Sequence, residues 1–95
     1  MLLDKSLRFT KPANVLVKHV RNECLLLNSQ TEMYFSLNAT GSDLFNMLCE
    51  GCRLSEAIAA VEDKYQPENT DVEVTCLEVV KSLLDRGLLE TQKER

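Results

Sequence analysis

The chain has 95 residues, which is enough for one domain with a single hydrophobic core. Hydrophobic residues make up 44% of the sequence and charged residues 27%, and these values exclude general disorder and fibrous repeats. The net charge of −4 is unevenly distributed, because residues 1–40 carry five Lys and Arg against three Asp and Glu, whereas residues 41–95 carry six against twelve. The acidic second half argues against its binding to phosphates or to an anionic membrane.

The start of the chain does not have the pattern of a secretory signal peptide. Asp4 and Lys5 interrupt the apolar beginning, and no apolar core of roughly 7–15 residues follows. The longest uninterrupted apolar run, residues 57–61, is far too short for a membrane span. We therefore expect a cytoplasmic protein whose four cysteines stay reduced.

Three short strands are expected in the first half of the chain. Residues 1–14 show no periodicity, and Pro12 favours either an N-terminal arm, over residues 1–12, or an entry to a strand. They are followed by three runs rich in apolar and β-branched residues, separated by polar breaks, at Val15–Val20, Cys24–Asn28 and Met33–Leu37. Consecutive strands with such short links predict an antiparallel meander.

The side chains of these strands indicate which faces are buried. The uninterrupted run Leu25–Leu27 predicts that the second strand is buried on both faces. Alternation in the third strand predicts two faces, one with Met33, Phe35 and Leu37 and the other with Tyr34 and Ser36. This strand contains neither Lys nor Pro, so nothing blocks its edge against the addition of a further strand.

The hydrophobic period changes from two to about 3.6 after Asn38, which predicts three helices. The first helix is expected to begin at a capping box, Thr40–Asp43, and to end at Gly51. The second helix is expected to be capped by Ser55 and to end before Pro67. Three strands followed by three helices predict an α+β domain with a winged-helix-like arrangement.

The third helix is expected to begin at the capping box Thr70–Glu73 and to end at Gly87. Its apolar stripe consists of Val72, Cys76, Val79 and Leu83. The stripe is unusually wide, because it is extended by Leu77, Val80 and Leu84. Either the small core wraps this helix more fully, or the surplus apolar surface forms a groove for a partner. Residues 91–95 are interpreted as a charged tail.

The cysteines and the single histidine do not form a convincing chemical site. Cys49 and Cys52 have the spacing of half a zinc site or of a redox pair, but a second pair of ligands is missing and the pair straddles a helix end. Cys24 and Cys76 lie on apolar faces, where cysteine behaves as a small hydrophobic residue. His19 has no partners for a catalytic triad. We therefore expect no catalytic residue, no metal ligand and no cofactor.

Several short motifs resemble those of a known family. The run Leu25–Leu27 is followed by Tyr34–Gly41, which reads YxxLNxTG, and then by Leu44–Phe45. Further matches follow at Glu50–Gly51, at Arg53, Glu56 and Ile58, and at Gly87–Leu89. In this order and spacing, the motifs resemble the family of the pyrroloquinoline quinone biosynthesis protein D, PqqD, over roughly residues 13–90. The chain departs from the family pattern at Leu54, which replaces the usual Thr cap of the second helix.

The resemblance implies a non-catalytic peptide-recognition domain over residues 13–90. Proteins of this family bind the leader of a ribosomally made precursor peptide and present it to a modifying enzyme, often a radical SAM enzyme. The leader is expected to add as a strand beside the third strand and to lie against the third helix. The residues expected to bind it are Met33, Tyr34, Phe35, Ser36, Leu37, Leu77, Val80, Lys81 and Leu84.

Two other binding functions would use the same features. A homodimer or a protein–protein adaptor would cover the same strand edge with its own partner. A winged-helix nucleic-acid-binding protein would need a basic recognition helix, whereas the third helix and its start carry four acidic residues and two basic ones. The sequence therefore favours a peptide partner over nucleic acid or a membrane.

Overall fold

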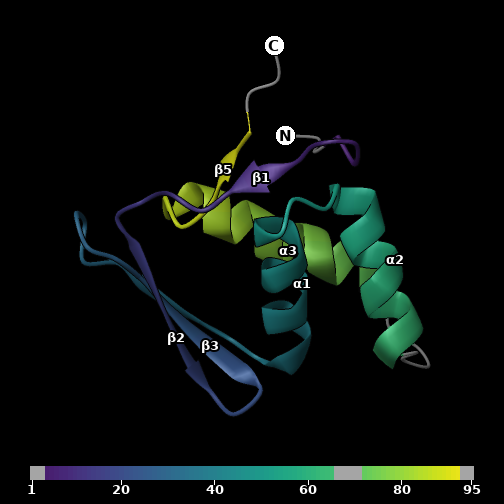
Figure 1. The fold of residues 1–95 in the computed structure, drawn as a ribbon, viewed down its shortest axis with the longest axis horizontal. Helices are drawn as coiled ribbons and strands as arrows, with labels where there is room; N and C mark the ends of the chain where they lie inside the picture. Colours follow the sequence, from purple (N-terminus) through teal and green to yellow (C-terminus); the bar gives the residue numbers. More distant parts are fainter. Residues whose placement is uncertain (1–3, 66–71, 93–95) are drawn as a thin grey trace.

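The computed structural model describes residues 4–65 and 72–92 of the chain. Its elements are β1 Phe9–Thr10, β2 Val15–Val20, β3 Glu23–Asn28, β4 Tyr34–Leu37, α1 Ala39–Cys49, α2 Leu54–Tyr65, α3 Val72–Asp85 and β5 Glu90–Thr91. A three-stranded antiparallel sheet has the order β2-β3-β4, and a second sheet pairs β1 with β5. Figure 1 shows β2 beside β3 and β1 beside β5. The predicted α+β class, with a three-stranded meander before three helices, is therefore confirmed.

The central strand β3 alternates between buried and exposed side chains. Leu26 lies in one row with Val17 and Phe35 on the inner face of the sheet, and it is fully buried. Its neighbour Leu25 points to the other face and is 38% exposed. The prediction that Leu25–Leu27 is buried on both faces was wrong, because the helices pack against only one side of the sheet (Figure 1).

Two short connections set the register of the sheet. β2 and β3 are joined by a tight turn in which Arg21 has a left-handed φ of 58°. β3 begins at Glu23, one residue before the predicted start at Cys24. Between β3 and β4, the Asn28 amide donates a hydrogen bond to the Met33 carbonyl at 2.8 Å. The third strand was predicted to begin at Met33, but β4 begins at Tyr34. Met33 therefore belongs to the loop before the strand.

Helix α1 begins earlier than its predicted capping box. Its N-cap is Asn38, whose side-chain oxygen accepts a hydrogen bond from the Gly41 amide at 2.9 Å. The predicted box at Thr40–Asp43 was therefore wrong. Because Asn38 alone separates β4 from α1, the direction of the helix is tied closely to the end of the strand.

Helix α2 begins at Leu54, so the predicted cap at Ser55 was also wrong. Glu56 completes half of a capping box, because its carboxylate accepts a hydrogen bond from the Arg53 amide at 2.8 Å. The predicted stop at Gly51, between the first two helices, is confirmed by its left-handed φ of 99°. The predicted end at Pro67 lies outside the described residues.

Helix α3 ends in a Schellman motif, as the position of Gly87 predicted. Gly87 has a φ of 68°, and its amide donates to the Leu84 carbonyl at 3.2 Å. The Leu88 amide donates to the Leu83 carbonyl at 2.9 Å, which completes the motif. The predicted cap of this helix at Thr70 lies outside the described residues.

The N-terminal segment and the end of the described chain pair with each other, which the sequence did not indicate. Phe9 lies opposite Thr91, and the Gln92 amide donates to the Arg8 carbonyl at 2.9 Å. Phe9 is only 2% exposed, so this segment contributes directly to the core. None of the helices within the described residues has the length and apolar character needed to cross a membrane.

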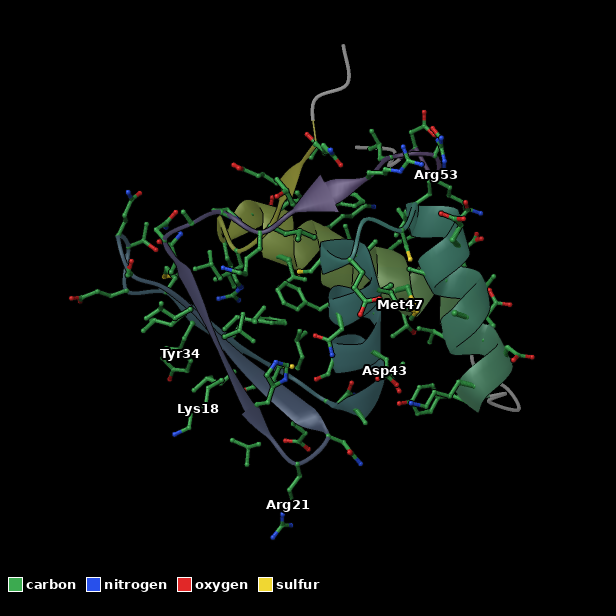
Figure 2. The ribbon with its side chains drawn as sticks, in the orientation of Figure 1. Lys18, Arg21, Tyr34, Asp43, Met47 and Arg53 are labelled. Carbon is green, nitrogen blue, oxygen red and sulfur yellow. The ribbon has the colours of Figure 1, made fainter. Side chains whose placement is uncertain are left out.

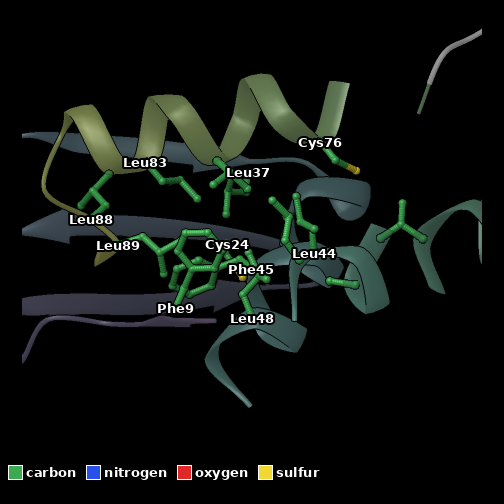
Figure 3. Packing of buried hydrophobic residues seen from close by; sticks show 14 of the residues in the cluster. Phe9, Cys24, Leu37, Leu44, Phe45, Leu48, Cys76, Leu83, Leu88 and Leu89 are labelled. Atoms are coloured by element: carbon green, nitrogen blue, oxygen red, sulfur yellow. The ribbon is translucent and has the colours of Figure 1, made fainter. Parts of the chain in front are cut away.

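One hydrophobic core joins the inner face of the sheet to the helices, and Figure 3 shows its centre. Phe45 and Leu48 of α1 and Leu83 of α3 are almost completely buried there. The buried Asn28 links the sheet to α3, because its side-chain amide donates to the Gly87 carbonyl at 3.1 Å. Its side-chain oxygen accepts a hydrogen bond from the Asn14 side chain at 2.7 Å. This polar contact fixes the end of α3 beside the sheet.

Candidate functional site

The free edge of β4 is the first component of the candidate site. β4 is the last strand of its sheet and, among the described residues, pairs only with β3. The Asn28–Met33 pair is hydrogen-bonded, and hydrogen-bonded pairs alternate along an antiparallel ladder, so the backbone groups of Phe35 point toward β3. The N–H and C=O groups of Tyr34 and Ser36 therefore point to the free edge.

The other edge of this sheet, β2, is less suited to accept a strand. Lys18 lies in the middle of β2, and Lys side chains on an edge discourage strand addition. Lys11 Nζ also donates a hydrogen bond to the Val15 carbonyl at 2.7 Å. β4 contains neither Lys nor Pro, so its edge is the more open of the two.

A cleft between α1 and α3 adjoins the end of β4. Its volume is about 180 Å³, and an apolar cavity of about 150 Å³ is known to hold a benzene molecule. The lining residues are Asn38, Thr40, Gly41, Leu44, Tyr65, Val72, Thr75, Cys76 and Val79. Because Asn38 directly follows β4, a chain added beside this strand would run toward the cleft.

One flank of α3 faces β4. Thr75 and Val79 lie one turn apart and both line the cleft. Arg86 continues this flank at the end of the helix, where its guanidinium carbon lies 5.0 Å from the centroid of the Phe35 ring. We call Thr75, Val79, Ser82 and Arg86, which follow each other at steps of three or four residues, the β4 flank of α3.

The α3 residues predicted to bind a peptide do not lie together on this flank. Val80 has no exposed surface and belongs to the core, so the expectation of an accessible Val80 was wrong. Leu77 and Lys81 follow Glu73 at steps of four residues, and Glu73 forms an ion pair with Lys5 of the N-terminal segment. Leu77 and Lys81 therefore lie on the flank of α3 that faces away from β4.

The remaining predicted residues divide between surface and core. Tyr34 and Met33 are 66% and 45% exposed, and Ser36 is exposed as well. Phe35 is half-buried, Leu37 is part of the core, and the predicted α3 residue Leu84 is partly buried against it. The strand can thus offer a ligand its backbone and only some of its side chains.

Asn38, Thr75, Val79 and Arg86 were not among the predicted site residues. Val79 was part of the predicted apolar stripe of α3, and this periodicity was the available signal for it. The stripe alone does not show which flank meets β4, because that depends on how α3 crosses the sheet. The helical periodicity therefore predicted an apolar stripe on α3 without showing which flank of the helix meets β4.

A small polar network supports one wall of the cleft. The Asp43 carboxylate accepts hydrogen bonds from Lys64 Nζ at 2.8 Å and from the Tyr65 hydroxyl. These hydrogen bonds lower the pKa of Asp43 and raise the pKa values of Lys64 and Tyr65. The network joins the last turn of α2 to the second turn of α1 and so fixes Tyr65 beside the cleft.

The four cysteines are free thiols in this structure. Cys76 lines the cleft, and burial raises its pKa to about 11, so the thiol is neutral at physiological pH. Cys49 is the last residue of α1, and Cys52 lies beyond the helix, as predicted for a pair that straddles a helix end. Within residues 4–65 and 72–92, no group of three or more His, Cys, Asp or Glu side chains is placed to hold a metal ion.

Comparison with known proteins connects this geometry to a family. The family model described as "Coenzyme PQQ synthesis protein D (PqqD)" matches residues 23–89. The solved structure of TbiB1 in complex with the TbiA(beta) leader peptide is similar to this chain at 30% sequence identity with a TM-score of 0.77, over 90% of this chain and 99% of TbiB1. Lasso peptide synthetase B1 complexed with the leader peptide shares the fold, with a TM-score of 0.74 and 23% identity over 86% of this chain and 96% of that chain. The comparison with curated proteins gave no match.

Proposed function

Because this chain belongs to the family of Coenzyme PQQ synthesis protein D, PqqD, we propose that it is a peptide-binding module that captures the leader of a ribosomally made precursor peptide. The free edge of β4 beside an apolar cleft is the observation that carries this proposal. Strand addition uses such an edge for main-chain hydrogen bonds and such a pocket for alternate side chains. The leader-peptide complex of TbiB1, which is 30% identical to this chain, supports the same role here.

We infer that the leader forms backbone hydrogen bonds with Tyr34 and Ser36, whose N–H and C=O groups point to the free edge. Each such bond contributes only about 0.5–1.5 kcal/mol net, so strand pairing sets the register and direction of the leader more than its affinity. Alternate side chains of the leader point to the inner side, where one of them enters the cleft next to Val79. Full burial of a large apolar side chain contributes about 1.5–3 kcal/mol, so this anchor dominates the affinity.

Arg86 is better placed than Lys81, one of the predicted binding residues, to form an ion pair with the leader. Arg86 belongs to the β4 flank and lies over Phe35, whereas Lys81 lies on the far flank. A leader carboxylate opposite Phe35 would lie within reach of the Arg86 guanidinium. An exposed ion pair of this kind contributes about 0.2–1 kcal/mol, so it tunes register without dominating affinity.

The module acts on the leader by binding and presentation, without chemistry of its own. Cys76, the thiol that lines the cleft, is kept neutral by its raised pKa and is a poor nucleophile. The bound leader is passed to a modifying enzyme, such as one of the radical SAM class. We place this event in the cytoplasm, where the precursor peptide is synthesised.

The two flanks of α3 offer a matched pair of variants to test the binding mode. The probe is a fluorescently labelled synthetic leader of the cognate precursor peptide, titrated by anisotropy. We expect Val79→Asp to weaken leader binding at least tenfold, because the substitution places a charge against the cleft. Leu77→Asp, at a partly buried position on the opposite flank, and Lys81→Ala should leave the affinity within about threefold of the wild type, which corresponds to less than about 0.7 kcal/mol.

Backbone amide NMR shifts provide the second readout. On addition of the leader, the largest shifts should fall on residues 34–38 and on the β4 flank of α3. Equal losses for Val79→Asp and Leu77→Asp, with both variants folded, would argue that the leader lies elsewhere on α3. Shifts confined to β2 or α2 would rule out the β4 edge as the binding site.

A further inference from the structure

The three-stranded sheet has an outer face that none of the described helices covers. The register places Leu16, Leu27 and Tyr34 in one row across this face. The next row contains Lys18 and Leu25. The inner face, by contrast, is covered by α1 and α3 and holds the buried side chains of the core.

This outer face is unusually apolar for a sheet surface in contact with water. Leu16, Val20, Leu25 and Tyr34 are 57%, 53%, 38% and 66% exposed. They account for four of the six large apolar side chains that are well exposed among the described residues. The water-facing side of an antiparallel sheet normally carries polar side chains, and exposed apolar residues are normally scattered singly over a protein surface. Their clustering on one face indicates a surface that another molecule covers.

The charges on and beside this face are mixed, with a basic excess. Lys18 lies among the apolar residues and Arg21 occupies the turn at the end of β2, whereas the acidic Glu23 is exposed on the same face opposite Val20. Figure 2 shows Lys18, Arg21 and Tyr34 projecting from the sheet away from the helices. The surrounding part of the chain, residues 1–40, has two more basic than acidic residues, whereas the remainder is strongly acidic. The face therefore suits a protein surface with an apolar centre and with carboxylates placed opposite Lys18 and Arg21.

We propose that this outer face is the docking surface for the enzyme that modifies the precursor peptide. The inference rests on the proposed function, because it depends on the position of the leader. A leader strand added to β4 directs every second side chain to the same side as Tyr34, so the leader extends the outer face by one strand. An enzyme seated on this face contacts the domain and the bound leader together.

This continuity favours the enzyme over a second copy of the chain. Two copies packed through their outer faces would cover Tyr34 and the outward side chains of the leader. Such a dimer would hide the leader from the enzyme that has to receive the precursor. A dimer formed through this outer face would therefore contradict the inference.

The test uses substitutions on β2, because this strand lies on the far side of β3 from the leader site. The variants are Leu16→Glu and Val20→Glu, with Lys18→Glu as a charge reversal that leaves the apolar residues in place. Val74→Glu is the matched control, because Val74 is 48% exposed but lies on α3. The probes are the labelled leader and the enzyme that modifies the cognate precursor, each titrated separately after circular dichroism has confirmed that the variants fold.

We expect Leu16→Glu and Val20→Glu to weaken binding to the enzyme at least tenfold and to leave leader affinity within twofold of the wild type. Lys18→Glu should weaken enzyme binding most at low salt, and Val74→Glu should change neither affinity. Unchanged enzyme affinity in the β2 variants would overturn the inference. So would sedimentation data showing a wild-type dimer that these variants convert to monomers. Failure of the wild-type chain to bind the leader at all would instead overturn the proposed function.

Discussion

Replacement of Ser36 by proline tests the assignment of the β4 edge most directly. Proline removes the backbone N–H, and in Ser36 this group is assigned to the free edge, where the leader would accept a hydrogen bond from it. The ladder between β3 and β4 does not use this group, because Ser36 and Leu25 form a non-hydrogen-bonded pair. Proline is compatible with an edge strand when its position faces outward.

The expected magnitude follows from the loss of one intermolecular hydrogen bond. Such a bond contributes about 0.5–1.5 kcal/mol net, so the dissociation constant for the leader should rise about two- to tenfold. Phe35→Pro is the opposite case, because the Phe35 N–H points into the ladder with β3. That variant should lose an internal hydrogen bond and a large part of its folding stability.

The assay compares leader affinity by anisotropy with the free energy of unfolding in urea. Ser36→Ala is the matched control, because it keeps the N–H and should bind within twofold of the wild type. If Ser36→Pro bound the leader as tightly as Ser36→Ala, the leader could not pair with this edge. If Ser36→Pro destabilised the fold as much as Phe35→Pro, the alternation assigned to β4 would be off by one residue.

Three further outcomes are expected. Asn28→Ala should lower the free energy of unfolding in urea by about 1–3 kcal/mol, because it leaves buried partners unpaired at both ends of the side chain; an unchanged midpoint would contradict this role. The pKa of Asp43 is lowered in the folded state, so Asp43→Asn should destabilise at neutral pH, and the difference from wild type should vanish as pH falls through the folded pKa; a difference that persists in acid would speak against the network. Cys24 and Cys76 are buried, so they should react with a thiol reagent at pH 8 only after denaturation, whereas the exposed Cys49 should react in the native state; native labelling of Cys76 would show that the cleft opens.

The sequence was sufficient for the elements whose signals are local. The left-handed glycines at Gly51 and Gly87 end their helices where predicted, because a positive φ is a local requirement that glycine meets without strain. Alternation in the third strand likewise predicted that Tyr34 and Ser36 share a face. The N-cap was misassigned because Thr40 and Asp43 fit a capping motif, whereas Asn38 caps the helix and Asp43 bonds to α2.

The signals that failed were those that depend on tertiary packing. The pairing of Phe9 with Thr91 joins two short segments at opposite ends of the chain, and neither has a strand pattern of its own. The same limit applies to the wide apolar stripe of α3. Val80 faces the core and Val79 faces the cleft, although both are valines in one stripe. The crossing of α3 over the sheet separates their roles, and periodicity within the helix does not encode that crossing.

The geometry of β4 explains how one short strand can serve two proposed partners. Its backbone groups at Tyr34 and Ser36 lie in the plane of the sheet and point to the free edge that is proposed to bind the leader. Its inner side chains, such as Leu37, point into the core, and its outer side chain at Tyr34 points to the face proposed for the enzyme. Because these three directions are separate, the two binding events can be perturbed separately, through the cleft for the leader and through Leu16 for the enzyme. In the proposed arrangement the enzyme contacts both the outer face and the bound leader, so the affinity for the enzyme should rise once the leader is bound. By reciprocity, the enzyme should tighten leader binding by the same factor.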